Sequence, residues 1–211
     1  MKRIILTAAM AIAVGASAMA QGFQGSIYFT RTTGKEVIKY AYHVAGDKVR
    51  IDEMEEGTGK LTGSMIVDLK LEKIYALSHE RHLYMEPVKK DAPVVPAGIE
   101  VKKGDLERMI RDKRCQQYRV KNTASNTEIN YWVTEGDYSF FPRLLKVLGR
   151  KDNLATYYMA LGNLDRQFPM MGNEYTLLRE ERGYVQVDRM EEKKLDAKLF
   201  AIPENYAEVD N

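Results

Sequence analysis

The stretch that decides the fold is FQGSIYFTR at residues 23–31, continued by KYAYHV at 39–44 and KVRIDEM at 48–54. In each segment apolar and polar residues alternate, and successive side chains of a strand point to opposite faces. Phe23, Ile27 and Phe29 therefore share one face, while Tyr28 and Thr30 share the other. This pattern predicts strands that bury one face and expose the other.

Working outward, three further segments of strand character follow, SMIVDL (64–69), KIYALS (73–78) and RHLYMEPV (81–88). The pair Gly46-Asp47 and the stretch EEGTGK at 55–60 read as tight turns. Six strands in about 65 residues is the spacing of an all-β sandwich or barrel. The sequence predicts a mainly β (α+β) fold, with a curved antiparallel sheet or incomplete β-barrel.

A Pro- and Gly-rich segment from Pro87 to Gly104 predicts a mobile surface loop, either disordered or acting as a flap. Strands resume as DLERMI (105–110), CQQYRV (115–120) and TEINYWVT (127–134), and later as YTLLREE (175–181) and YVQVDRMEEKKL (184–195). In the third of these, Ile129, Tyr131 and Val133 alternate with polar or aromatic neighbours. Sheet pairing is expected to continue through this region.

A helical insert is expected at about residues 138–162. Phe141, Leu144, Leu145 and Leu148 recur at i, i+3, i+4 and i+7, with Asp137 or Ser139 as the cap and Gly149 as the stop. A second short helix is predicted from Leu154 to Leu161, with Asn153 as its cap and Tyr157 and Tyr158 on its apolar stripe. The concave face of the sheet is the apolar surface that can bury both stripes. The insert is expected either to pack as an ordinary part of the hydrophobic core or to form a lid over a cavity.

Residues 1–20 have the form of a cleavable secretory signal peptide, with Lys2 and Arg3, an apolar run from Ile4 to Val14, and cleavage expected after Ala20. The run is too short to cross a bilayer, and no other segment predicts a transmembrane span. We therefore expect a periplasmic or secreted protein with one domain at 21–211. Cleavage of the signal peptide would remove Lys2 and Arg3 from the 32 basic residues, which leaves 30 basic and 30 acidic residues. A neutral chain argues against nucleic acid as a partner.

The residues that carry chemistry form no recognisable site. His79 and His82 are expected on opposite faces of a strand, and Asp52, Glu53, Glu55 and Glu56 read as solvated turn charges. No Gly-x-Ser-x-Gly elbow or phosphate-binding glycine loop occurs. A Ser-His-Asp arrangement through His43, His79 or His82 stays open in principle, because the fold assembles such triads. We expect no catalytic residue, no metal and no cofactor.

Cys115 is the single cysteine, in the strand-like context KRCQQYRV. It is expected to be a small buried core residue, the alternative being an intermolecular disulfide or a reactive thiol.

The run of FQGSIYF, DKVRID, SMIVDL, KIYALS, LYMEP, CQQYRV, Trp132-Val133-Thr134, QFPM and KKLDAKLFAIPENY resembles the domain-of-unknown-function 4412 family. That family is similar to the periplasmic lipoprotein carriers of the LolA/LolB-like superfamily. Members often carry Gly-Tyr/Phe-Lys before the cysteine, where this chain has Asp112-Lys113-Arg114. The resemblance implies an incomplete antiparallel barrel around helices, with an apolar cavity and no catalytic residues.

These observations predict a non-enzymatic protein that binds a lipid, an acylated protein or another apolar ligand between sheet and insert. The alternative is an envelope protein-interaction or assembly module that recruits a protein partner through an edge strand or the Pro-rich loop. Residues expected to line the cavity are Ile27, Phe29, Tyr40, Tyr42, Met65, Val67, Phe141, Leu144, Leu145, Leu148, Tyr157 and Tyr158.

Overall fold

The computed structural model describes residues 22–209, and the predicted signal peptide lies outside this range. Twelve strands form one sheet in the order β12-β6-β5-β4-β3-β2-β1-β11-β10-β9-β8-β7. The strands are β1 (Gly25–Thr33), β2 (Glu36–Ala45), β3 (Lys48–Glu55), β4 (Leu61–Asp68), β5 (Lys73–Ser78), β6 (Leu83–Met85), β7 (Ile99–Ile110), β8 (Lys113–Asn122), β9 (Thr127–Glu135), β10 (Gln167–Tyr175), β11 (Glu181–Glu192) and β12 (Ala207–Glu208).

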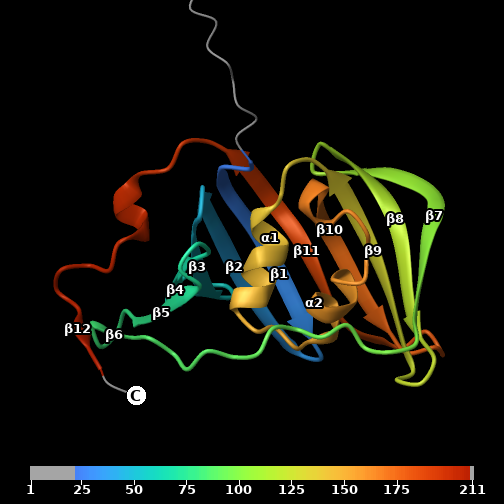
Figure 1. Cartoon of the computed structure of the whole chain (residues 1–211), viewed down its shortest axis with the longest axis horizontal. Coiled ribbons are helices and arrows are strands. Elements are labelled where there is room, and N and C mark those ends of the chain that lie inside the picture. The colour runs from blue at the N-terminus through green and yellow to red at the C-terminus, as the bar shows by residue number, and fades with distance from the viewer. Residues whose placement is uncertain (1–21, 210–211) are drawn as a thin grey trace, which may run out of the picture.

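The sheet is an open, curved half-barrel rather than a closed barrel (Figure 1). β1 to β6 form the predicted six-stranded meander, and β11 returns to pair with β1 in the antiparallel sense. All neighbouring strands pair antiparallel except β12, which lies parallel to β6. The prediction of a mainly β, open curved sheet is confirmed.

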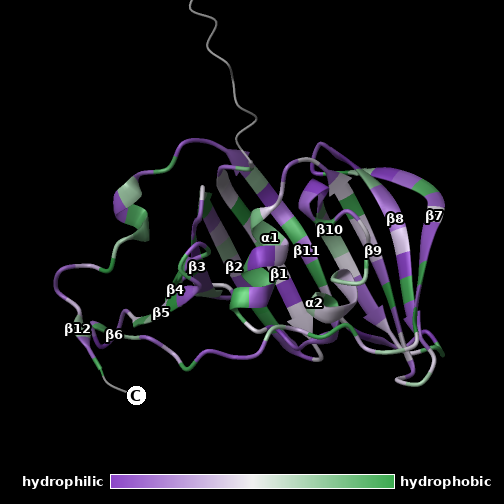
Figure 2. Ribbon diagram, in the orientation of Figure 1, coloured by the Kyte–Doolittle hydropathy of each residue, from purple (hydrophilic) through white to green (hydrophobic). Residues whose placement is uncertain are grey.

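The alternation read from the sequence sets the two faces of the sheet. Ile27 and Phe29 on β1 are buried toward the concave side, and Ile129, Tyr131 and Val133 on β9 are buried too. Figure 2 shows the corresponding alternation of hydrophobic and hydrophilic bands along the strands. Pro169 lies at an irregularity between β10 and β9, a place where a strand tolerates a residue without an amide hydrogen.

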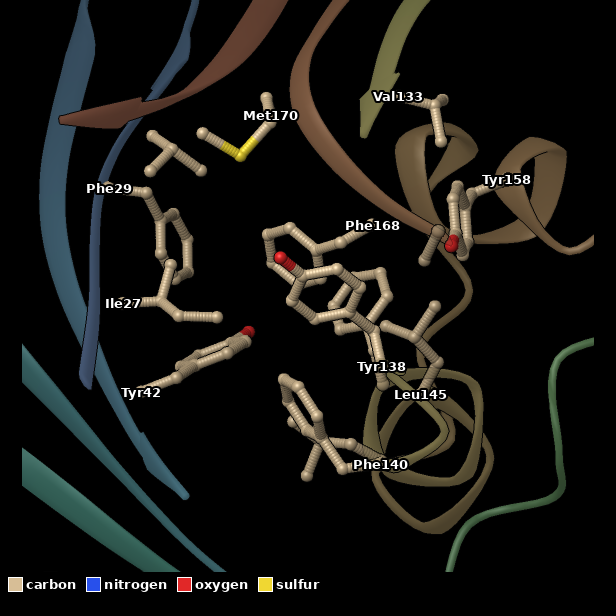
Figure 3. Packing of buried hydrophobic residues seen from close by; sticks show 14 of the residues in the cluster. Ile27, Phe29, Tyr42, Val133, Tyr138, Phe140, Leu145, Tyr158, Phe168 and Met170 are labelled. Carbon is tan, nitrogen blue, oxygen red and sulfur yellow. The ribbon is translucent and has the colours of Figure 1, made fainter. Parts of the chain in front are cut away.

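Two short helices pack on the concave face, α1 (Phe140–Val147) and α2 (Asn153–Tyr158). α1 buries Phe141, Leu144 and Leu145, as its predicted stripe requires. Figure 3 shows Ile27, Phe29 and Tyr42 of the sheet facing a group that includes Tyr138, Phe140, Leu145 and Phe168. Phe141 and Phe168 pack edge to face with ring centroids 4.7 Å apart, a geometry that aromatic pairs favour. The 3-10 turns η1 (Leu164–Arg166) and η2 (Ala197–Phe200) complete the elements.

The cap of α1 is a predicted residue, and the cap of α2 is not. Ser139 is the N-cap of α1, although its side chain makes no cap hydrogen bond. The N-cap of α2 is Asp152, whose Oδ1 accepts from the Ala155 amide at 3.3 Å. Asn153 lies inside the helix, and its Nδ2 donates to Glu174 Oε1 at 2.7 Å. The negative charge of the Asp152 carboxylate also interacts favourably with the positive N-terminal end of the α2 dipole.

The loop after β6 is shorter than predicted. It ends at Gly98, because β7 begins at Ile99 and pairs Ile99 with Asn122 and Val101 with Val120. Since β6 and β7 lie near opposite ends of the strand order, the coil of residues 86–98 must cross the width of the sheet. Figure 1 shows this coil passing along the helices on its way to β7.

The turn before Cys115 is built by Arg111 and Asp112, which connect β7 to β8 with φ angles of 46° and 64°. Two consecutive left-handed residues are typical of a type I′ hairpin turn, in which Asn and Gly are preferred. Of the three residues that depart from the family sequence, only Asp112 lies in the turn, where it takes a left-handed conformation that glycine adopts more readily. Cys115 itself is fully buried, as predicted.

Candidate functional site

A cleft of about 700 Å³ opens between the concave face of β1 to β4 and the segment that links the two helices. Its volume falls in the range of roughly 300–1,000 Å³ that is typical of ligand pockets. The residues that line it are Arg31, Tyr40, Tyr42, Ile51, Glu53, Met65, Lys90, Leu148, Gly149, Arg150, Lys151 and Asp152. The sheet supplies an apolar floor, and most of the charged residues come from the loops above it.

The floor follows from the register of the strands. Tyr42 on β2 pairs with Ile51 on β3, and Ile51 pairs with Met65 on β4. Residues that pair across neighbouring strands share one face, so these three side chains form a row across the sheet. Tyr40 lies two residues from Tyr42 on the same face, and its ring stacks on Phe29 at 5.3 Å.

A second, smaller pocket of about 70 Å³, called the inner pocket below, lies between the helices and strands β1, β2, β9, β10 and β11. Phe29, Phe141, Leu145 and Phe168 are among its apolar walls, and Arg31, Tyr42, Arg150 and Asp152 line both pockets. The two spaces are therefore neighbours with a charged group at their boundary. The inner pocket holds at most a few water-sized groups.

Predicted cavity residues fall into three groups. Tyr40, Tyr42, Met65 and Leu148 line the large cleft. Phe29, Phe141 and Leu145 line the inner pocket, which Tyr42 also reaches. The remaining five, Ile27, Val67, Leu144, Tyr157 and Tyr158, are buried in the hydrophobic core and line neither space. Binding of a ligand by any of these residues stays a prediction.

The charged boundary is organised by Asp152. Its Oδ1 lies 3.4 Å from Arg31 Nη2, and its Oδ2 lies 3.8 Å from Arg150 Nε. Burial alone would lower the pKa of Arg150, but Tyr42, Asp152 and Tyr40 outweigh it, so the pKa stays above its ordinary value. Burial raises the pKa of Tyr42. At neutral pH the boundary therefore holds the charged guanidinium of Arg150 and the neutral phenol of Tyr42, beside Arg31 and Asp152.

The crossing coil closes one side of the cleft. Gly149 follows α1 with a φ of 58°, and a Cβ built on it would lie 2.4 Å from Lys90 Cβ and 2.9 Å from Asp91 O. The coil thus lies directly against the link between the helices. Glycine is required here both for its left-handed conformation and for this close approach.

A separate polar network occupies the opposite, convex face of the same strands. Asp52 Oδ1 accepts from Arg50 Nε at 2.7 Å and from Ser64 Oγ, and Asp52 Oδ2 lies 3.3 Å from His43 Nε2. His43 Nδ1 lies 2.8 Å from Ser26 Oγ. Asp52 belongs to β3, so its prediction as a solvated turn charge was wrong. Burial would raise the pKa of Asp52, but hydrogen bonds with His43, Ser64 and Arg50 outweigh it and lower the pKa.

The network continues into the C-terminal segment. Ser64 Oγ lies 2.7 Å from His79 Nε2, and His79 Nδ1 lies 2.6 Å from the hydroxyl of Tyr206. The prediction that His79 and His82 point to opposite faces of a strand was wrong. Both lie in the turn after β5, His82 with a φ of 52°, and both rings pack on Tyr206. Arg50 Nη1 also donates to Leu199 O at 3.3 Å.

The convex network has the residue types of a serine hydrolase but not its accessibility. Ser26 is 1% exposed and Ser64 is 5% exposed. A nucleophile must reach a substrate carbonyl, and neither hydroxyl is open to one. The hydrogen bonds instead connect strands β1 to β4 with the C-terminal segment, which indicates a structural role.

Two further observations bear on the chemistry. Within residues 22–209, no group of three or more His, Cys, Asp or Glu side chains is placed to hold a metal ion. In that same range, every helix is too short or too polar to cross a membrane.

Fold and cleft together define a class, an open β half-barrel with a helical insert on its concave face and a cleft beside the insert. The sequence profile of the domain of unknown function (DUF4412) matches residues 23–206, and the chain therefore belongs to this family. No curated protein matches the chain.

One of three similar solved structures has a TM-score above 0.5, and it supports the fold. An uncharacterized conserved protein from Thermus thermophilus matches over 92% of this chain and 92% of its own, with a TM-score of 0.55 and 7% identity. PNGF-II matches with a TM-score of 0.43 and 11% identity over 88% of this chain but 30% of that protein. A candidate outer membrane lipoprotein-sorting protein domain from Vibrio parahaemolyticus covers 83% of this chain and 87% of its own, with a TM-score of 0.32 and 6% identity.

Sequence reasoning missed the charged part of the cleft. Arg150, Lys151 and Asp152 form the link between two amphipathic helices, and Lys90 lies in a distant loop. A run of charges between two helices that cover an apolar face could have marked the link. Nothing in the local sequence places Lys90 beside it.

Proposed function

We propose that this is a periplasmic or secreted, non-enzymatic protein that binds a lipid, an acylated protein or another apolar ligand in the cleft above β2 to β4. The observation that carries the proposal is a cleft of about 700 Å³ with Tyr40, Tyr42 and Met65 on its floor. Apolar surface left open to water is unfavourable by about 25 cal/mol per Å². Tyr40 and Met65 are half-buried, and a ligand that covers the part of them that is open to water removes that cost. The signal peptide and the relation to lipoprotein carriers are part of this proposal.

The test is binding of an uncharged, solvatochromic apolar dye to the purified protein after lipids are removed by unfolding and refolding. Met65→Trp adds bulk to the floor of the cleft and should lower the affinity at least several-fold. Met109→Trp is the matched control, since Met109 lies on β7 and is 64% exposed. Native mass spectrometry of protein isolated without the unfolding step should show a bound lipid-sized mass. Absence of dye binding together with no extractable ligand would refute the proposal.

One observation favours the alternative, an envelope assembly module. β7 is a twelve-residue strand at the edge of the sheet, with Val101, Leu106 and Met109 exposed. Exposed edge strands can pair with another chain. However, Gln116 Nε2 donates to Gly104 O at 2.7 Å and to Leu106 O at 3.1 Å, across an irregularity in the strand. This bulge interrupts the edge and makes continuous pairing less favourable.

Crosslinking in the native envelope distinguishes the two functions. A stoichiometric protein partner that is lost when Leu106 and Met109 are changed to Lys would favour the assembly module. Retention of dye binding in the same variant would show that the cleft acts independently of that edge.

A further inference from the structure

The rim of the cleft carries an excess of positive charge. Arg31, Lys90, Arg150 and Lys151 line it together with two carboxylates, Glu53 and Asp152. Asp152 is already engaged, because it forms ion pairs with Arg31 and Arg150 and also caps α2. Lys90 and Lys151 make no ion pair with any carboxylate in the described range of the chain. The rim therefore offers cations without enough anions to neutralise them.

Arg150 lies at the boundary that the cleft shares with the inner pocket. Its side chain is 35% exposed, and its only ion pair with a described residue is the long contact of 3.8 Å to Asp152. Tyr42 also interacts with this guanidinium, but the phenol carries no charge at neutral pH. If hydrocarbon alone filled the cleft, the guanidinium would lose water without gaining an anionic partner, which is unfavourable for a charged group. A ligand that brings an anionic group to this position avoids that loss, since guanidinium groups bind carboxylates and phosphates by paired, charge-assisted hydrogen bonds.

The arrangement of charge and apolar surface also gives the ligand a direction. The cations Lys90, Arg150 and Lys151 belong to the crossing coil and to the link between the helices. The apolar residues Tyr40, Ile51 and Met65 belong to the strands. A ligand with its anionic group at these loops would have its apolar part lying along the sheet.

We infer that the ligand is an amphiphile with an anionic head, held by Arg150, Lys90 and Lys151, and with an apolar chain lying over Tyr40, Tyr42 and Met65. This inference rests on the proposed function and adds the charge of the head. Carboxylate and phosphate heads share the required chemistry. Cationic and uncharged heads do not.

The experiment compares amphiphiles that share one twelve-carbon chain, titrated calorimetrically below their micelle concentrations into the full mature chain at low salt. Dodecanoate and dodecyl phosphate should bind about tenfold more tightly than dodecyl maltoside or dodecyltrimethylammonium. The preference should shrink as salt is added, because the rim is partly exposed. Inorganic phosphate alone should bind far more weakly than dodecyl phosphate.

Two rim variants and one control test the residues. Arg150→Gln and Lys151→Gln should each reduce the preference for the anionic head, Arg150→Gln more strongly. Lys39→Gln removes the same charge from β2 but on the opposite face from Tyr40, and it should leave the preference unchanged. Urea unfolding of each variant establishes that the fold is intact, and Lys151 is exposed, so its replacement leaves the packing unaltered.

The outcomes separate the two proposals. Equal binding of all twelve-carbon amphiphiles, unaffected by Arg150→Gln and Lys151→Gln, would overturn the anionic head while the apolar site stands. Equal affinity for inorganic phosphate and dodecyl phosphate would also overturn it, because the twelve-carbon chain of the ligand would then contribute nothing to binding. Failure of every amphiphile and of the uncharged dye would refute the proposed function itself.

Discussion

Leu144 and Leu148 provide a matched pair that measures whether the cleft is open or tightly packed. Both are leucines of the same helical stripe, one turn apart. Leu144 is 0% exposed within the core, whereas Leu148 is half-buried and lines the cleft. Leu→Ala removes three carbon groups, or about 2.4 kcal/mol at about 0.8 kcal/mol each when the site is fully buried. A cavity term adds to this only where the surroundings are packed on all sides.

We therefore expect Leu144→Ala to lower the free energy of unfolding by about 3–4 kcal/mol and Leu148→Ala by about 1 kcal/mol. Urea unfolding followed by circular dichroism measures both, and equal m-values confirm that the unfolding reactions are comparable. Leu148→Ala should also weaken binding of the uncharged dye in proportion to the apolar wall it removes. Equal destabilisation by the two replacements would show that Leu148 is packed as tightly as Leu144, and would refute the open cleft.

Three other predictions follow from the local structure. Replacing Arg111-Asp112 by Asn-Gly should raise the free energy of unfolding in urea by about 1 kcal/mol, because both positions have left-handed backbone conformations that Asn and Gly adopt readily. If the replacement gave no gain in stability, the turn would not be of type I′. Burial raises the pKa of the Cys115 thiol to about 11. A thiol reagent at pH 8 should therefore modify Cys115 at least a hundredfold faster in the unfolded protein than in the native one. Comparable rates of modification would place Cys115 at the surface. Burial and Arg50 lower the pKa of His79 from 6.5, so the neutral form is favoured in the folded state and stability should fall as the pH drops below about 6.5. The lowered pKa of Asp52 adds a second loss of stability below about pH 3.8, and His79→Gln should remove only the first of these in urea titrations at successive pH values.

Much of the fold could be predicted because apolar and polar residues alternate along most of its strands. Ile27, Phe29, Tyr42 and Ile51 are buried on the face that the alternation assigns to them. The helical stripe of α1 was equally clear, since Leu144 and Leu145 can share a buried face only in a helix. The start of β7 was missed because the alternation of apolar and polar residues there covers only Ile99 to Lys102 and ends at Lys103-Gly104, inside a Pro- and Gly-rich segment.

The convex network could not be predicted because it joins residues from six parts of the chain, namely β1, β2, β3, β4, the turn after β5 and the C-terminal segment. Asp52 follows the strand pattern only as a polar position, and nothing near it specifies that His43, Ser64 and Arg50 contact it. Tyr206 meets His79 across 127 residues. Contacts of this kind depend on the register of paired strands and on the path of the C-terminal segment, which become known only when the sheet is assembled.

The cleft itself follows from a mismatch between the width of the sheet and the size of the insert. Twelve strands at about 4.8 Å spacing make a surface roughly 50 Å wide before curvature, whereas two helices of about 10 Å diameter cover roughly 20 Å of it. α2 packs on β9 and β10, so the floor over β2 to β4 receives little helical cover. The crossing coil reaches that region with Lys90, a charged side chain that cannot fill an apolar space. A sheet this wide, with an insert this small, leaves apolar surface that a bound amphiphile would cover.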